Sequence, residues 1–75
     1  MKVVGFKRST GEYKGYNFDK IHIHCLYPAD ESKEQSGQLS TVIKVPIALF
    51  EQSNISLGDE IDPIYDRFGT LIGFN

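Results

Sequence analysis

The stretch Tyr16–Tyr27, YNFDKIHIHCLY, carries the clearest periodic pattern in the chain. Apolar residues recur at every second position from Ile21 onward, and this period is typical of a half-buried β-strand. The pattern predicts one apolar face turned toward a core and one aromatic, basic face turned outward. The inward set is Ile21, Ile23, Cys25 and Tyr27, and the outward set is Tyr16, Phe18, Lys20, His22, His24 and Leu26.

Shorter patterns on either side of this strand predict the other elements. Strands are expected at Lys2–Arg8, Leu39–Val45, Glu60–Tyr65 and Thr70–Phe74, and a helix of about two turns is expected at Pro46–Gln52. The connecting segments are Ser9–Gly15, the acidic and exposed loop Pro28–Gly37, and the hairpin turn Asp66–Gly69. In the first strand, Val4 and Phe6 should share one face and Val3 the other. Pro63 indicates an edge strand or a bulge.

The order of these elements is strand, strand, strand, short helix, strand, strand. It is the order of the OB-fold, a five-stranded Greek-key barrel whose helix lies between strands three and four. The sequence therefore predicts an all-β, OB-like barrel in which residues 1–75 form a single domain. An SH3-like barrel is the main alternative, and it would lack a true helix after Val45. A chain of 75 residues builds a small core, so a homodimer is also expected.

Composition and charge indicate the compartment of the protein and the distribution of charge over its surface. The lone Cys25 fits a reducing compartment, and the N-terminal residues show no apolar targeting segment, so we expect a cytoplasmic protein without membrane contact. The net charge is −2, but residues 1–24 sum to +3 and residues 25–75 to −5. Such asymmetry favours a positive stripe on one face, although an ordinary solvated surface would also account for it.

Catalytic and metal-binding patterns are weak. His22 and His24 share a strand face, but no third ligand is fixed by spacing, and exposed or stacking histidines are the simpler interpretation. Cys25 should be an inert core thiol, because it alternates inward with Ile21 and Ile23. No Ser, His and Asp grouping and no phosphate-binding glycine motif is present. The sequence thus predicts a protein that is not an enzyme and has no metal or cofactor.

The remaining pattern combines flat aromatic side chains with interleaved cations. Single-stranded nucleic acid is bound by such groups, because bases stack on the rings and cations follow the phosphate backbone. The competing interpretation places Tyr16 and Phe18 in the core of a curled strand. The candidate nucleic-acid-binding residues are Lys7, Arg8, Tyr13, Lys14, Tyr16, Phe18, Lys20, His22, His24, Lys44, Arg67 and Phe68.

A family resemblance rests on the C-terminal segment Gly58-Asp59-Glu60-Ile61 through Tyr65-Asp66-Arg67-Phe68-Gly69-Thr70-Leu71-Ile72-Gly73. This segment resembles the C-terminal hairpin of small OB-fold single-stranded-DNA-binding proteins from bacteriophages and conjugative elements. The resemblance implies cooperative, sequence-tolerant binding of single-stranded DNA, usually by a dimer, as part of a mobile element. The acidic total charge departs from that pattern.

Two functions follow as expectations. The first is non-catalytic binding of single-stranded DNA through the aromatic and basic strand face, with DNA favoured over RNA as the nucleic acid but the choice between them left open. The second is a small protein–protein interaction or assembly domain that pairs through an exposed strand edge or through the same aromatic face. The acidic segments Asp30–Glu34 and Asp59–Asp66 favour the second function, because they would repel nucleic acid.

Overall fold

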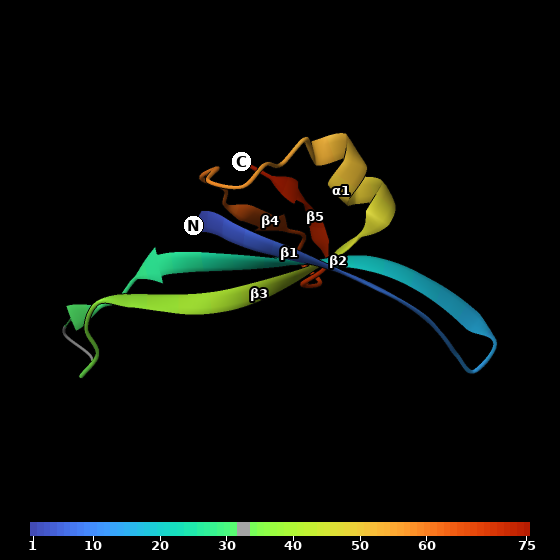
Figure 1. The fold of residues 1–75 in the computed structure, drawn as a ribbon, viewed down its shortest axis with the longest axis horizontal. Helices are drawn as coiled ribbons and strands as arrows, with labels where there is room; N and C mark the ends of the chain where they lie inside the picture. Colours follow the sequence, from blue (N-terminus) through green and yellow to red (C-terminus); the bar gives the residue numbers. More distant parts are fainter. Residues whose placement is uncertain (32–33) are drawn as a thin grey trace.

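The computed structural model describes residues 1–31 and 34–75 (Figure 1). Its elements are β1 (Lys2–Tyr13), β2 (Tyr16–Pro28), β3 (Gln38–Pro46), α1 (Ile47–Ser53), β4 (Pro63–Tyr65) and β5 (Leu71–Phe74). The mostly β architecture, with one short helix between the third and fourth strands, confirms the predicted order of elements. The described part of the predicted loop Pro28–Gly37 lies between β2 and β3, and residues 32–33 of that loop lie outside the described residues.

The first three strands form an antiparallel sheet in the order β1-β2-β3. β2 pairs with β3 only as far as Lys20, which lies opposite Pro46, whereas β1 and β2 stay paired to Tyr13 and Tyr16. Residues 9–20 therefore form a two-stranded arm that extends away from the rest of the chain (Figure 1). The arm gives the molecule a length of 45 Å against a width of about 25 Å.

The arm replaces the loop that was predicted for Ser9–Gly15. β1 continues to Tyr13, and only Lys14 and Gly15 form the turn. Both turn residues have positive φ angles, 50° and 80°, as in the type I′ turns that match the twist of a hairpin. The prediction of a break at Ser9 was wrong, because a continuous ladder with β2 satisfies the backbone groups of these residues.

A bulge in β1 changes which residues face the core. The register with β2 shifts between Val3 and Gly5, so that Val3 lies opposite Cys25 and Phe6 lies opposite Ile23. Val3 and Phe6 thus share the core face, and the prediction that they lie on opposite faces was wrong. The ring of Phe6 meets the ring of Phe50 edge to face, with centroids 5.2 Å apart, and so anchors α1 to the sheet.

The core lies between one face of the three-stranded sheet and a second layer. Its buried residues are Val3, Ile21, Ile23, Cys25, Ile43, Val45 and Ile61. The second layer consists of α1 and the two-stranded sheet β4–β5, which lie together on one side of β1–β3 (Figure 1). This arrangement confirms the predicted inward face of β2 for Ile21, Ile23 and Cys25.

The two sheets meet through the N-terminal residues. Val3 N donates to Asp59 O at 2.9 Å, Ile61 N donates to Met1 O at 2.8 Å, and Lys2 forms an isolated bridge with Glu60. The fourth strand begins at Pro63 rather than at Glu60, and it pairs only with β5, as expected of a strand that contains proline. The described residues form sheets of three and two strands rather than a closed five-stranded barrel, so the predicted Greek-key closure is not confirmed.

Candidate nucleic-acid interface

The face of β1–β3 that points away from the core has a regular pattern of side chains, and we call it the outer face. Because paired residues of antiparallel strands share a face, the register places its residues in rows across the sheet. From the arm tip inward, the rows are Tyr13 and Tyr16; Gly11 and Phe18; Ser9, Lys20 and Pro46; Lys7, His22 and Lys44; Gly5, His24 and Val42; and Lys2, Leu26 and Ser40. The aromatic rows therefore lie on the arm and the cationic rows beside it.

The outer face concentrates positive charge. Its lysines are Lys2, Lys7, Lys20 and Lys44. At the outer-face positions of these three described strands no Asp or Glu occurs, because Glu12 and Asp19 alternate onto the opposite face. The sheet therefore separates charge that the sequence mixes, and a chain of net charge −2 presents one cationic face.

One row of the outer face places three nitrogen-bearing side chains on adjacent strands. Lys7 lies opposite His22 on one side, and Lys44 lies opposite His22 on the other. We call Lys7, His22 and Lys44 the cationic row. Directly opposed residues have Cβ atoms roughly 5 Å apart, and like charges at that spacing destabilise a sheet. The two lysines lie on strands to either side of the histidine, so a charge on the imidazole would have a like charge opposite it on both strands.

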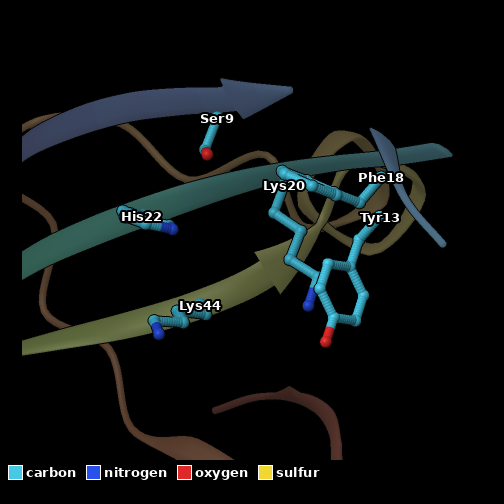
Figure 2. A pocket seen from close by; sticks show the side chains of 6 residues that line it. All are labelled: Ser9, Tyr13, Phe18, Lys20, His22 and Lys44. Carbon is cyan, nitrogen blue, oxygen red and sulfur yellow. The ribbon is translucent and has the colours of Figure 1, made fainter. Parts of the chain in front are cut away.

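A pocket of about 390 Å³ opens on the outer face where the arm joins the sheet. It is lined by Ser9, Tyr13, Phe18, Lys20, His22 and Lys44. Tyr13 and Phe18 extend from the arm, the Lys20 side chain extends away from β2 toward the Tyr13 ring, and His22 and Lys44 lie farther along the sheet (Figure 2). The pocket therefore has an aromatic end and a cationic end, which matches the chemistry of a base joined to a phosphate.

The aromatic residues of the arm are accessible to a ligand. Tyr13 and Tyr16 at the tip are 66% and 79% exposed, and Phe18 is 37% exposed. The ring of Phe18 lies over its cross-strand partner Gly11. The interpretation of Tyr16 and Phe18 as core residues is therefore wrong. Beside them, the Lys14 ammonium lies 5.4 Å from the centre of the Tyr13 ring, so the tip also carries a cation.

Arg8 lies apart from the other candidate residues. It is paired with Ile21 and so belongs to the core-facing side of the sheet. Its guanidinium donates two hydrogen bonds to the Asp19 carboxylate, from Nε at 2.9 Å and from Nη2 at 2.5 Å. The hydrogen bond and the charge of Asp19 raise the pKa of Arg8, and the hydrogen bond from Arg8 lowers the pKa of Asp19. This pair braces the base of the arm from the side opposite the pocket.

Arg67 and Phe68 also lie outside the pocket. They occupy the β4–β5 turn, where Phe68 is 78% exposed and the Arg67 guanidinium lies 4.9 Å from the centre of its ring. The Asp66 Oδ1 atom accepts hydrogen bonds from the backbone N–H groups of Phe68 and Thr70, at 2.8 and 3.0 Å, which fixes the turn. The predicted hairpin turn at Asp66–Gly69 is confirmed, but neither Arg67 nor Phe68 lines the pocket.

Sequence reasoning missed one pocket residue. Ser9 lines the pocket between the aromatic and cationic ends, whereas the sequence pattern assigned it to a loop. The alternation of Lys7, Ser9, Gly11 and Tyr13 has the period of a strand and would have placed Ser9 on the outer face.

No metal centre is indicated in the described part of the chain, where no group of three or more His, Cys, Asp or Glu side chains is placed to hold an ion. His24 lies on the outer face beside His22, whereas Cys25 is buried. Burial raises the pKa of the Cys25 thiol and so keeps it protonated. Among the described residues, no helix has the length and apolar character required to cross a membrane.

Comparisons with protein-family models, with curated proteins and with solved structures gave no match.

Proposed function

We propose that the outer face binds single-stranded DNA without catalysis. The observation that supports this function is the separation of charge by the sheet, which leaves lysines, histidines and exposed aromatic rings on one face. Stacking of bases on aromatic side chains contributes about 1 to 3 kcal/mol per base and tolerates any sequence. Bases would stack on the aromatic side chains of the arm, and the adjoining lysines would contact the sugar–phosphate backbone.

The acidic total charge does not oppose this function. Most carboxylates lie in the loop after β2 and between Glu51 and Asp66, whereas the lysines of the outer face lie on strands that carry their carboxylates on the other side. Charges farther away than a Debye length, about 8 to 10 Å at physiological salt, are largely screened. Carboxylates beyond that distance would therefore weaken binding little, whereas Glu60, the bridge partner of Lys2, lies at the edge of the outer face.

Titration of a fluorescent dT20 oligonucleotide at 50 and 200 mM salt tests the proposal. Each lysine–phosphate contact contributes about 0.7 to the slope of log K against log salt for single strands. We expect a slope of about −2 to −3 for the outer face. The variant Lys20→Glu should lower the affinity at least tenfold. Arg67→Glu is the matched control, because it changes the net charge equally but lies outside the pocket.

Two results would refute the proposal. One is the absence of dT20 binding at 50 mM salt. The other is an equal loss of affinity in Lys20→Glu and Arg67→Glu, which would show that only net charge matters. A competition arm with a single-stranded RNA of the same length and with duplex DNA measures the preference for single-stranded DNA.

A second candidate function is assembly through protein contacts, and exposed apolar residues on the second sheet support it. Ile64, Tyr65, Phe68 and Ile72 are all exposed on the β4–β5 hairpin. Two-stranded sheets are marginally stable alone, and a second copy of this chain would bury these residues in a homodimer. Sedimentation equilibrium should then give a dimer for the wild type and a monomer for Ile72→Glu. A monomeric wild type at 100 μM would exclude the homodimer.

A further inference from the structure

The cationic row places an imidazole between two lysine side chains. His22 lies at its centre, with Lys7 opposite on β1 and Lys44 opposite on β3. On its own strand, the nearest outer-face residues are Lys20 and His24. The helix and the β4–β5 sheet pack against the other face of β2, and no Asp or Glu occupies an outer-face position of the described strands β1–β3. Glu60, which bridges Lys2 at the edge of β1, lies two rows away from His22.

We propose that Lys7, His22 and Lys44 form a phosphate-binding row whose central imidazole takes up a proton when a phosphodiester binds. In the free protein, the imidazole lies between two lysines at cross-strand distance, on a strand face that carries no carboxylate within β1–β3. A phosphate over the row reverses the sign of the local field and favours the protonated form. This inference rests on the proposed function for its natural ligand, single-stranded DNA.

The consequence is regulation of binding by pH. Proton uptake and phosphate binding are linked, so each must strengthen the other by the same factor. Histidine is the side chain whose charge changes between pH 5 and 8, so the effect falls in the physiological range. Affinity for single-stranded DNA should therefore increase as pH falls.

His24 provides a matched control within the same strand. It lies on the outer face two residues from His22, but its cross-strand partners are Gly5 and Val42 rather than lysines. It therefore has the same side chain and a similar position without the flanking cations. If the cationic row is responsible, the pH dependence should belong to His22 and not to His24.

The first measurement is the affinity for dT20 at pH 7.8 and 5.8 and constant ionic strength, because neither thymine nor the phosphodiester titrates in this range. We expect the wild-type affinity to rise roughly fivefold, within the limit of tenfold per pH unit that one proton sets. The slope against salt should steepen by about 0.7, the value of one added phosphate contact. His22→Gln should remove both changes, and His24→Gln should retain them.

The second measurement needs no nucleic acid. The imidazole proton signals of His22 and His24 are followed by NMR through a pH titration, with sulfate or with chloride at the same ionic strength. Sulfate is a tetrahedral oxyanion that keeps its charge over this range. We expect sulfate to move the titration midpoint of His22 to higher pH and to move that of His24 much less.

The outcomes separate this inference from the proposed function. If dT20 binds with the same pH dependence in wild type and in His22→Gln, proton uptake at the cationic row is refuted, and the proposed binding of single-stranded DNA is not. If dT20 does not bind but sulfate selectively affects His22, the proposed binding of single-stranded DNA is refuted, and anion-linked proton uptake at the cationic row is supported. Equal sulfate effects on both histidines, or none on either, overturn the row.

Discussion

Phe18 covers Gly11, its direct partner across the arm, and the absence of a side chain on Gly11 makes the contact possible. A Cβ atom on Gly11 would lie 2.6 Å from Cζ of the Phe18 ring, well inside van der Waals contact. An aromatic ring over a cross-strand glycine shields the exposed backbone of a sheet edge. Phe18 also lines the pocket, where it forms part of the aromatic end.

Substitution of Gly11 should therefore affect the ligand more than the fold. In Gly11→Ala the Phe18 ring must rotate away, and we expect the affinity for dT20 to fall by roughly fivefold to tenfold, about the contribution of one stacked base. Gly5→Ala is the control, because its added Cβ would meet the Cβ of His24 at an ordinary 3.8 Å. Urea unfolding of both variants checks that each still folds. Equal affinities for the two variants would show that Phe18 does not stack on the ligand.

The Arg8–Asp19 pair predicts an acid-sensitive component of stability. Because the hydrogen bond from Arg8 lowers the pKa of Asp19 in the folded chain, the pair stabilises the fold above the usual aspartate value of about 3.9. This stability is lost as pH falls from that value through the lower folded pKa. Asp19→Asn should lose the component, whereas Glu12→Gln, on the same side of the arm, should retain it. Urea unfolding between pH 2 and 6 makes the comparison, and identical profiles for wild type and Asp19→Asn would refute it.

Local patterns predicted much of the fold and of the candidate site. The alternation of Ile21, Ile23 and Cys25 defined the two faces of β2. Asp66 correctly indicated the last turn, and Pro46 indicated the helix start to within one residue, since the helix begins at Ile47. These features depend on nearby residues, so the sequence carries them directly.

Features that depend on distant partners were not predictable. β1 continues through Gly11 opposite the Phe18 ring of β2, and the bulge before Gly5 puts Phe6 on the core face, where its ring meets Phe50. The position of Arg8 on the core side follows from that bulge. The relation between the two sheets depends on hydrogen bonds between the N-terminal residues and Asp59–Ile61. The local sequence pattern does not indicate these hydrogen bonds.

Cys25 predicts an alkali-sensitive component of stability. Burial raises the pKa of the thiol in the folded chain, so the unfolded chain loses its proton first as pH rises. Stability is therefore complete below the ordinary thiol range and decreases from about pH 9 upward. Cys25→Ala should be less stable at neutral pH by roughly 1 kcal/mol, from the lost core volume, but should show no such decrease. Rapid reaction of the native thiol with a disulfide reagent would contradict its burial.

The turn at the arm tip gives the last prediction, because Lys14 adopts a left-handed backbone that suits asparagine better. Its φ angle is 50°, and such a conformation costs a residue with a Cβ roughly 1 to 2 kcal/mol, whereas Asn-Gly is a favoured pair in type I′ turns. Lys14→Asn should raise the free energy of unfolding by about 0.5 to 1 kcal/mol in urea. Lys7→Asn, on extended backbone in β1, removes the same charge without that gain. If Lys14 contacts phosphate, Lys14→Asn should also flatten the salt dependence of dT20 binding by about 0.7. If Lys14→Asn is more stable but binds less tightly, the wild-type turn keeps a cation beside Tyr13 at a cost in stability. A less stable Lys14→Asn would refute the assignment of the turn.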